Sequence, residues 1–163
     1  MGMQTDVKST HIMLGTSGLV YAGRTRLKGA VVSNTQSGTP ANVAFTSNVA
    51  LSGTYTTSTT TCTVTVSAGH GLLTGARVLL VFTSGGSATG PYTVTVTSAT
   101  AFTVAVASSS NSGNVSVYAT MLMEVDITNS VPCSVLIPGE GILAPDGIYC
   151  GVPTYIAATV FYG

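Results

Sequence analysis

Charged side chains are scarce in this sequence. Its 163 residues include only five Lys or Arg and five Asp or Glu, which is 6% of the chain, whereas an average soluble domain of this length carries about 40 charges. The formal net charge is +0, so there is no general electrostatic attraction for nucleic acid or for an anionic membrane. We therefore expect neither nucleic acid nor membrane as a partner.

Tryptophan and long apolar runs are also absent. Hydrophobic residues make up 45% of the chain and its mean hydropathy is +0.50, a composition that excludes intrinsic disorder. Yet no run approaches the roughly 18 to 20 apolar residues of a membrane span. The first residues have no cationic cluster followed by an apolar segment, as a secretory signal would. We expect a soluble, folded chain made in a cytosol.

Cysteines are few, and their spacing points to no metal site. Cys62, Cys133 and Cys150 form no Cys-x-x-Cys pair and have no nearby histidine to complete a zinc set. We expect buried reduced thiols, and a bridge between Cys133 and Cys150 is the alternative. No cofactor and no metal are predicted.

The polar residues are mainly Thr and Ser, which alternate with Val and aromatic residues at a period of two. Cys62, Val64 and Val66 would share one face of a strand, and residues 92–96 and 102–106 repeat the pattern. No stretch has the apolar stripe and caps of a helix. These patterns predict an all-β chain, with a β-sandwich or jelly-roll-like frame and an inserted small four-stranded antiparallel module.

Charge also divides the chain into segments. From Thr54 to Val115 the only charged side chain is Arg77, and the flanks carry the rest. We predict a discontinuous frame domain interrupted by a module, with docking and oligomerisation assigned to the frame. The predicted frame covers residues 1–53 and 117–163, and the predicted module covers residues 54–116. Frame strands are expected at residues 18–21, 24–33, 43–51, 120–128, 133–137 and 156–162.

Two segments superficially suggest chemistry. The run from Gly69 to Gly75 resembles a phosphate-binding loop, but such loops need a helix after them, and residues 76–83 alternate as a strand. We interpret it as a β-turn in which the His70 ring bonds to the local backbone. Glu140 and Asp146 lie in a loop with two prolines. A structural loop is the preferred interpretation, and a calcium site or an acid–base pair is the alternative.

Nucleophile motifs are missing, because the sequence has no Gly-x-Ser-x-Gly and only two histidines. We therefore predict that the chain is not an enzyme.

The first flank is basic and the last is acidic. Arg24 and Arg26 would share one strand face, and so would Glu124 and Asp126, so these strands can pair across a sheet or across a subunit boundary. Solvated edge charges are the alternative interpretation. Tyrosine and phenylalanine near the end of the chain would fill sheet contacts or an interface core. The candidate interface residues are Arg24, Arg26, Lys28, Glu124, Asp126, Tyr155, Phe161 and Tyr162.

Several segments of the flanks are distinctive in their order along the chain: TDVKST at 5–10, VYAGRTRLKG at 20–29, IPGEGIL at 137–143 and TVFYG at 159–163. Together these flanks resemble small virion structural proteins of tailed bacteriophages, notably those of cyanobacteria and marine bacteria. In those relatives a short turn connects the strands that the module separates here. The module, with HGLLTG at 70–75, GPYTV at 90–94 and AFTV at 101–104, is similar to a small β module of phage tail and bacterial surface proteins.

The resemblance implies a head decoration (cement) protein that binds the outer capsid as a homotrimer, with the major capsid protein or another virion protein as its partner. It would be located on the virion surface and made in the host bacterial cytoplasm. A tail, baseplate or fibre-associated component is an alternative, as is an adhesin that binds host glycans through Tyr92 and its loop neighbours. Burial in an assembly would also cover strand edges and apolar patches that invite aggregation.

Overall fold

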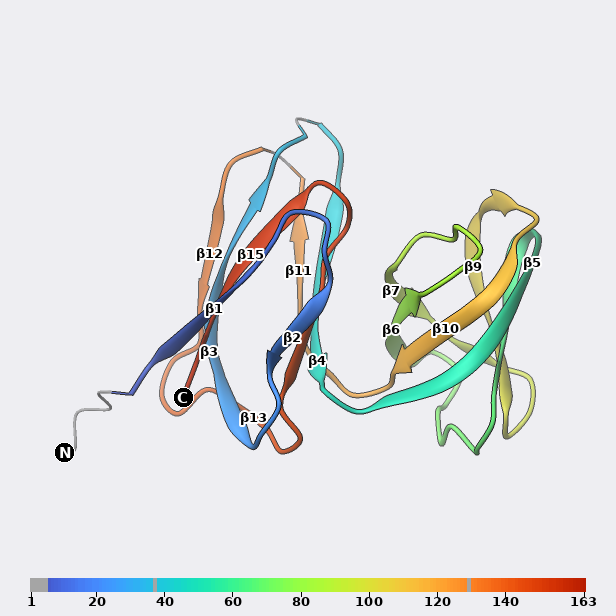
Figure 1. Cartoon of the computed structure of the whole chain (residues 1–163), viewed down its shortest axis with the longest axis horizontal. Helices are drawn as coiled ribbons and strands as arrows, with labels where there is room; N and C mark the ends of the chain where they lie inside the picture. Colours follow the sequence, from blue (N-terminus) through green and yellow to red (C-terminus); the bar gives the residue numbers. More distant parts are fainter. Residues whose placement is uncertain (1–5, 37, 129) are drawn as a thin grey trace. The chain divides into compact units, whose positions relative to one another are not determined.

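The computed structural model describes residues 6–36, 38–128 and 130–163 (Figure 1). Fifteen strands and no helix occur in these ranges, so the predicted all-β class is confirmed. The described residues accordingly include no helix that is long and apolar enough to cross a membrane.

The chain folds as two compact units. We call Met1–Asn48 together with Leu122–Gly163 the frame, and Val49–Met121 the module. The joints predicted from charge, at residues 53 and 117, lie within five residues of these boundaries.

Two sheets form the frame. The first has the strand order β1-β15-β3-β12, with β13 also paired to β3, and the second has the order β11-β4-β14-β2. The strands of the first sheet are β1 (Lys8–Ile12), β15 (Ile156–Tyr162), β3 (Thr25–Asn34), β12 (Cys133–Leu136) and β13 (Ile142–Ala144). Those of the second sheet are β11 (Met121–Ile127), β4 (Ala41–Ser47), β14 (Ile148–Gly151) and β2 (Gly18–Tyr21).

The order of these strands is that of a jelly roll. When β12 and β13 are counted as one interrupted strand, chain order across the two sheets becomes 1-8-3-6 and 5-4-7-2, which is the double Greek key of jelly rolls. The module follows β4 and precedes β11, and these two strands are neighbours in the second sheet. It therefore takes the place of a hairpin turn, where an insertion leaves the sheet intact.

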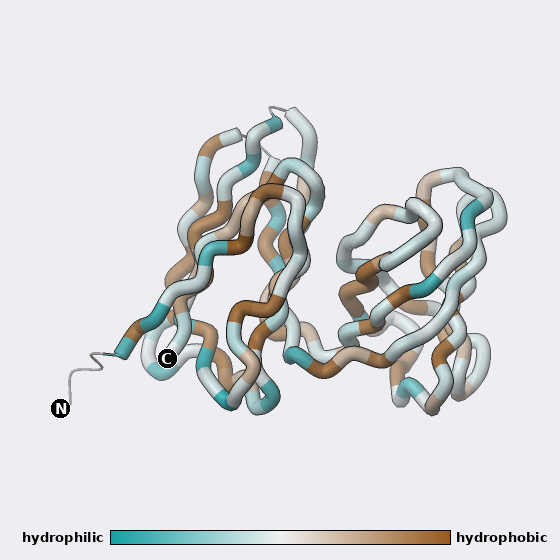
Figure 2. The backbone as a smooth tube through the Cα atoms, in the orientation of Figure 1, coloured by the Kyte–Doolittle hydropathy of each residue, from teal (hydrophilic) through white to brown (hydrophobic). Residues whose placement is uncertain are grey.

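A single core fills the space between the two sheets. Along β15 every second residue is buried, and Figure 2 shows the same alternation of hydrophobic and hydrophilic positions in other strands. The second sheet contributes Phe45, the largest fully buried side chain of the frame. Alternation at a period of two is what turns one face of each strand to the core. The core includes Leu27, Val32, Val43, Phe45, Ile148, Cys150, Ile156 and Val160.

The module is one curled sheet of six strands, with the order β7-β6-β10-β5-β9-β8. The two edge strands of this sheet, β7 and β8, follow each other in sequence with only Val94 between them. The backbone of Val94 forms hydrogen bonds with Gly75 and Ala76. The two edges of the sheet are therefore joined by one continuous segment. The strands are β5 (Ala50–Val66), β6 (Arg77–Phe82), β7 (Gly90–Thr93), β8 (Thr95–Val96), β9 (Ala101–Ser109) and β10 (Ser112–Tyr118).

The prediction of four module strands is wrong. The missed strand β10 begins Ser-Gly-Asn and carries only two valines, so its alternation is too short to stand out. The sixth strand arises because the predicted strand at residues 92–96 is interrupted at Val94 and forms two strands, β7 and β8. The expected alternation itself is present in β5, where Cys62, Val64 and Val66 are buried and the threonines between them are exposed.

Most frame strands lie where they were expected, and β2 and β15 match their predicted ranges residue for residue. The predicted strand at residues 43–51 is wrong as a single element, because β4 ends at Ser47 and β5 begins at Ala50 in the other unit. Three short strands were not predicted, namely β1, β13 and β14. β1 has one apolar residue, β13 has only three residues in all, and β14 contains glycine. Sheet pairing, and not a local pattern, therefore decides their conformation.

Candidate interaction site

Two of the predicted interface cations are bound within the frame. Arg26 Nη2 lies 3.1 Å from Glu140 Oε2, and Arg26 Nη1 donates to the Gly141 carbonyl oxygen at 3.4 Å. Lys28 Nζ donates to the Glu140 carbonyl oxygen at 2.8 Å. These contacts fasten the loop before β13 to β3, so Arg26 and Lys28 have a structural role in this loop.

The predicted pairing of these cations with Glu124 and Asp126 across one sheet is wrong within a single chain. β3 belongs to the first sheet and β11 to the second, and each pairs with other strands. Glu124 instead accepts a hydrogen bond from Asn42 Nδ2 at 3.1 Å. Charge order along the chain could not reveal this, because jelly-roll topology places consecutive segments in different layers.

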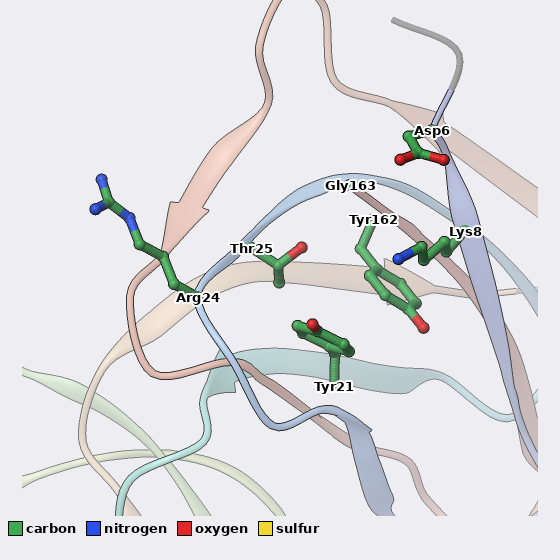
Figure 3. A pocket seen from close by; sticks show the side chains of 7 residues that line it. All are labelled: Asp6, Lys8, Tyr21, Arg24, Thr25, Tyr162 and Gly163. Carbon is green, nitrogen blue, oxygen red and sulfur yellow. The ribbon is translucent and has the colours of Figure 1, made fainter.

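A pocket of about 180 Å³ opens in the frame where β1, β2, β3 and β15 have their ends (Figure 3). The rings of Tyr21 and Tyr162 pack together with centroids 5.2 Å apart, and the Tyr162 hydroxyl lies 3.3 Å from Thr10 Oγ1. Arg24 stands on one side of the rings, and Lys8 with Asp6 on the other. The lining residues are Asp6, Lys8, Tyr21, Arg24, Thr25, Tyr162 and Gly163.

Both cations of this pocket have free side chains. Within the described ranges, Lys8 and Arg24 make no side-chain hydrogen bond or ion pair, and Asp6 makes none either. Among the lining side chains, two cations stand against one carboxylate. The pocket can therefore accept an anionic group next to two aromatic rings.

A second candidate surface lies on the outward face of the first sheet, and we call Val31, Leu136, Leu143 and Phe161 the outer patch. Leu136 is 80% exposed and Leu143 is 40% exposed, while Val31 and Phe161 are half-buried and lie outside the core. Leu136 and Phe161 lie on the two sides of β3, and Leu143 pairs with Arg26. The outer patch is therefore an apolar area bordered by the Arg26–Glu140 ion pair.

Gly29 lies at the centre of the outer patch. It pairs with Phe161 on one side and with Leu136 on the other. A Cβ atom at this position would meet the Val135 carbonyl oxygen, so the position admits only glycine. The absence of a side chain leaves Leu136 free to lie across β3 towards Phe161.

The three predicted aromatic residues therefore have different positions. Phe161 faces outward in the patch, Tyr162 forms a wall of the pocket, and Tyr155 packs against the core and donates to the Pro40 carbonyl oxygen at 3.3 Å. Sequence reasoning identified Arg24, Phe161 and Tyr162, but it missed Lys8, Tyr21 and the leucines. In β12, Val135 faces the core and Leu136 faces outward. A large apolar residue at an outward position was the one sign in the sequence of the outer patch.

The glycine-rich segment of the module is a turn, as predicted. His70 Nδ1 accepts the Leu72 N–H at 3.0 Å, which leaves the proton on Nε2 for the Ser98 carbonyl oxygen, also at 3.0 Å. The ring is buried and contacts Phe102 edge-on. Both ring nitrogens are thus used to hold the backbone of the loop.

The other acidic loop residue also has a structural partner. Asp146 Oδ2 accepts a hydrogen bond from Ser47 Oγ at 3.2 Å, whereas Glu140 pairs with Arg26. No group of three His, Cys, Asp or Glu side chains among the described residues is placed to hold a metal ion. The bonds of Asp146 and Glu140 support the structural interpretation of the loop.

The cysteines are free thiols, so the alternative of a Cys133–Cys150 bridge is wrong. Cys62 and Cys150 are buried and Cys133 is half-buried. Burial raises the pKa of the Cys62 thiol to about 11 and raises the pKa of the Cys150 thiol further, so both remain protonated and unreactive at neutral pH.

Tyr92, the residue suggested for glycan stacking, is engaged inside the module. Its hydroxyl donates to the Ala88 carbonyl oxygen at 2.6 Å and its ring meets Phe82 edge-on. Burial, with a smaller contribution from the Cys62 thiolate, raises the pKa of the Tyr92 hydroxyl. A half-buried ring used in this way offers little surface for a sugar.

Comparison with known proteins finds no matching family model, no similar curated protein and no similar solved structure.

Proposed function

We propose that this chain is a non-enzymatic structural protein of a tailed phage, a head decoration protein that binds the outer capsid as a homotrimer and stabilises it. The outer patch carries this proposal. A soluble protein with ten charged residues presents Leu136 at 80% exposure on a rigid sheet, and an exposed apolar area on a charge-poor surface is typical of a protein–protein contact.

The fold and the sequence resemblance support the same proposal by analogy. Jelly rolls form viral capsid domains, although they also form lectins and cupins, and a fold does not determine a function. The flank motifs that resemble virion proteins lie around the two candidate surfaces, with residues 20–29 supplying Arg24 and residues 137–143 supplying Leu143.

The proposed mechanism is passive clamping. The frame docks on neighbouring capsomers through the outer patch, and the jelly roll transmits force between them because its core is close-packed. A stable site needs on the order of 1,200 to 2,000 Å² of buried surface, so the outer patch is the centre of a contact whose rim comes from Ser and Thr side chains. Burying Leu136 contributes about 1.5 to 3 kcal/mol.

Particles assembled without the chain provide the test. Adding the purified protein should restore resistance to heat and to chelators, and Leu136→Ser should weaken particle binding about tenfold or more. Leu73→Ser is the matched control, because Leu73 is 79% exposed but lies in the module.

Particles that lack the chain and still equal complete particles in resistance would overturn the cement role. Binding to purified tails instead of heads would indicate the tail, baseplate or fibre alternative.

A further inference from the structure

Five of the nine charged side chains of the frame have partners within the frame. Arg26 and Lys28 bind the Glu140 segment, Glu124 binds Asn42 and Asp146 binds Ser47. The remaining charges are Lys8, Arg24 and Asp6 around the pocket, and Asp126 on β11. Among the described residues, Asp126 is exposed and its side chain has no hydrogen bond or ion pair.

The two sets of unpaired charges are complementary. The side chains that line the pocket have an excess of one positive charge, and Asp126 supplies one negative charge. A carboxylate that enters the pocket would neutralise it, and the adjoining rings of Tyr21 and Tyr162 would exclude part of the water that screens the attraction. A volume of about 180 Å³ is sufficient for a short acidic side chain.

One chain cannot make this contact with itself. Tyr21 lies on β2 and Asp126 on β11, and these strands are the opposite edges of the four-stranded second sheet. Three strand spacings of about 4.8 Å separate such edges by about 14 Å. The contact therefore requires a second copy and joins two different surfaces, so that it builds either a closed ring or an open chain.

We infer that Asp126 of one copy inserts into the Lys8–Arg24 pocket of the next copy and thereby forms the head-to-tail contact of the homo-oligomer. This inference rests on the proposed function and specifies how its oligomer is held together. Lys8 contributes the cation beside the Tyr162 ring, and Arg24, which is exposed, closes over the entering carboxylate.

Charge reversal in the purified full chain tests the contact. By sedimentation velocity at low salt, Arg24→Glu and Asp126→Arg should each weaken association about tenfold or more, because each places like charges together. The double variant Arg24→Glu/Asp126→Arg should recover most of the lost affinity, and wild-type association should weaken at high salt. Both positions are exposed, and circular dichroism verifies that each variant is folded.

A matched control separates pairing from net charge. Arg24→Glu combined with Ser110→Arg and Asn114→Arg has the same net charge as the double variant, but Ser110 and Asn114 are exposed residues of the module. This variant should remain dissociated. Equal association in all variants, a wild-type monomer at every concentration, or a double variant no better than the single ones would overturn the inference.

A further outcome distinguishes the inference from the proposed function. If Arg24→Glu lost binding to particles while Asp126→Arg bound normally and both kept wild-type association, the pocket would receive a carboxylate of the coat protein. The contact between copies would then be refuted, and the proposed function would stand.

Discussion

Arg26 and Glu140 form a salt bridge, with Arg26 Nη2 and Glu140 Oε2 3.1 Å apart. The Glu140 side chain is 80% exposed, so water screens the attraction and such pairs contribute about 0.2 to 1 kcal/mol. We expect Glu140→Gln to lower the free energy of unfolding by less than about 1 kcal/mol in urea denaturation. A loss several times larger would show that the side chain, and not the loop backbone, holds this segment.

The backbone of the same loop should be far less tolerant. Gly141 has φ of +76° and an added Cβ would meet the Leu27 carbonyl oxygen, whereas Gly139 has φ of +68° with nothing within 4 Å. Left-handed backbone costs an alanine about 1 to 2 kcal/mol at either position. Gly141→Ala should therefore lower the melting temperature more than Gly139→Ala does, and equal shifts would contradict the close packing of Gly141 against β3.

The two histidines should respond differently to removal. His70 is buried with both ring nitrogens bonded, whereas His11 is exposed and reaches only Thr159 Oγ1 at 3.2 Å. His70→Leu leaves the Leu72 N–H and the Ser98 carbonyl without partners and should cost about 1 to 3 kcal/mol. His11→Leu should change the unfolding free energy by less than about 0.5 kcal/mol, and similar losses for the two variants would contradict the role of His70.

Stability of the module should fall in alkaline solution. The Cys62 thiol has a pKa of about 11 in the folded state against an ordinary value of 9.0. Between these pH values the unfolded chain releases the proton first, so unfolding becomes more favourable as pH rises, and below pH 9 the effect is absent. Denaturant unfolding between pH 8 and pH 10 should show this decline, and Cys62→Ala should make it shallower. An unchanged slope in Cys62→Ala would contradict the prediction.

Limited proteolysis should separate the two units. The joining segments around Val49 and Thr120 are exposed and lie outside the strands, and exposed irregular backbone is where proteases cut. We expect a broad-specificity protease to release a resistant fragment close to residues 49–121, identified by mass spectrometry. Cleavage spread evenly along the chain would contradict the division into two units.

How much the sequence could predict depended on the length of each pattern. The Cys62–Val66 run alternates strictly, and β2 and β15 are short apolar runs rich in β-branched or aromatic residues. These signals are local, and all three segments were predicted. β1 and β10 are polar strands that exist only because a neighbour supplies their hydrogen bonds, so no local signal marks them.

The candidate site was less accessible to prediction because it is assembled from distant segments. Arg24 and Tyr162 were identified individually, but their meeting with Lys8 and Tyr21 requires the pairing of β1 with β15 and the position of β2. Arg26 and Arg24 are equivalent in an alternating sequence. In the structure their roles differ, because Arg26 forms an ion pair with Glu140 whereas Arg24 lines the pocket.

The proposed capsid role is best tested by cryo-electron microscopy of particles purified from the phage that is proposed to carry this chain. We expect symmetric density on the outer head surface that fits the jelly-roll frame, with the Leu136 face against the capsid. Particles in which mass spectrometry finds no trace of this chain would refute the proposal.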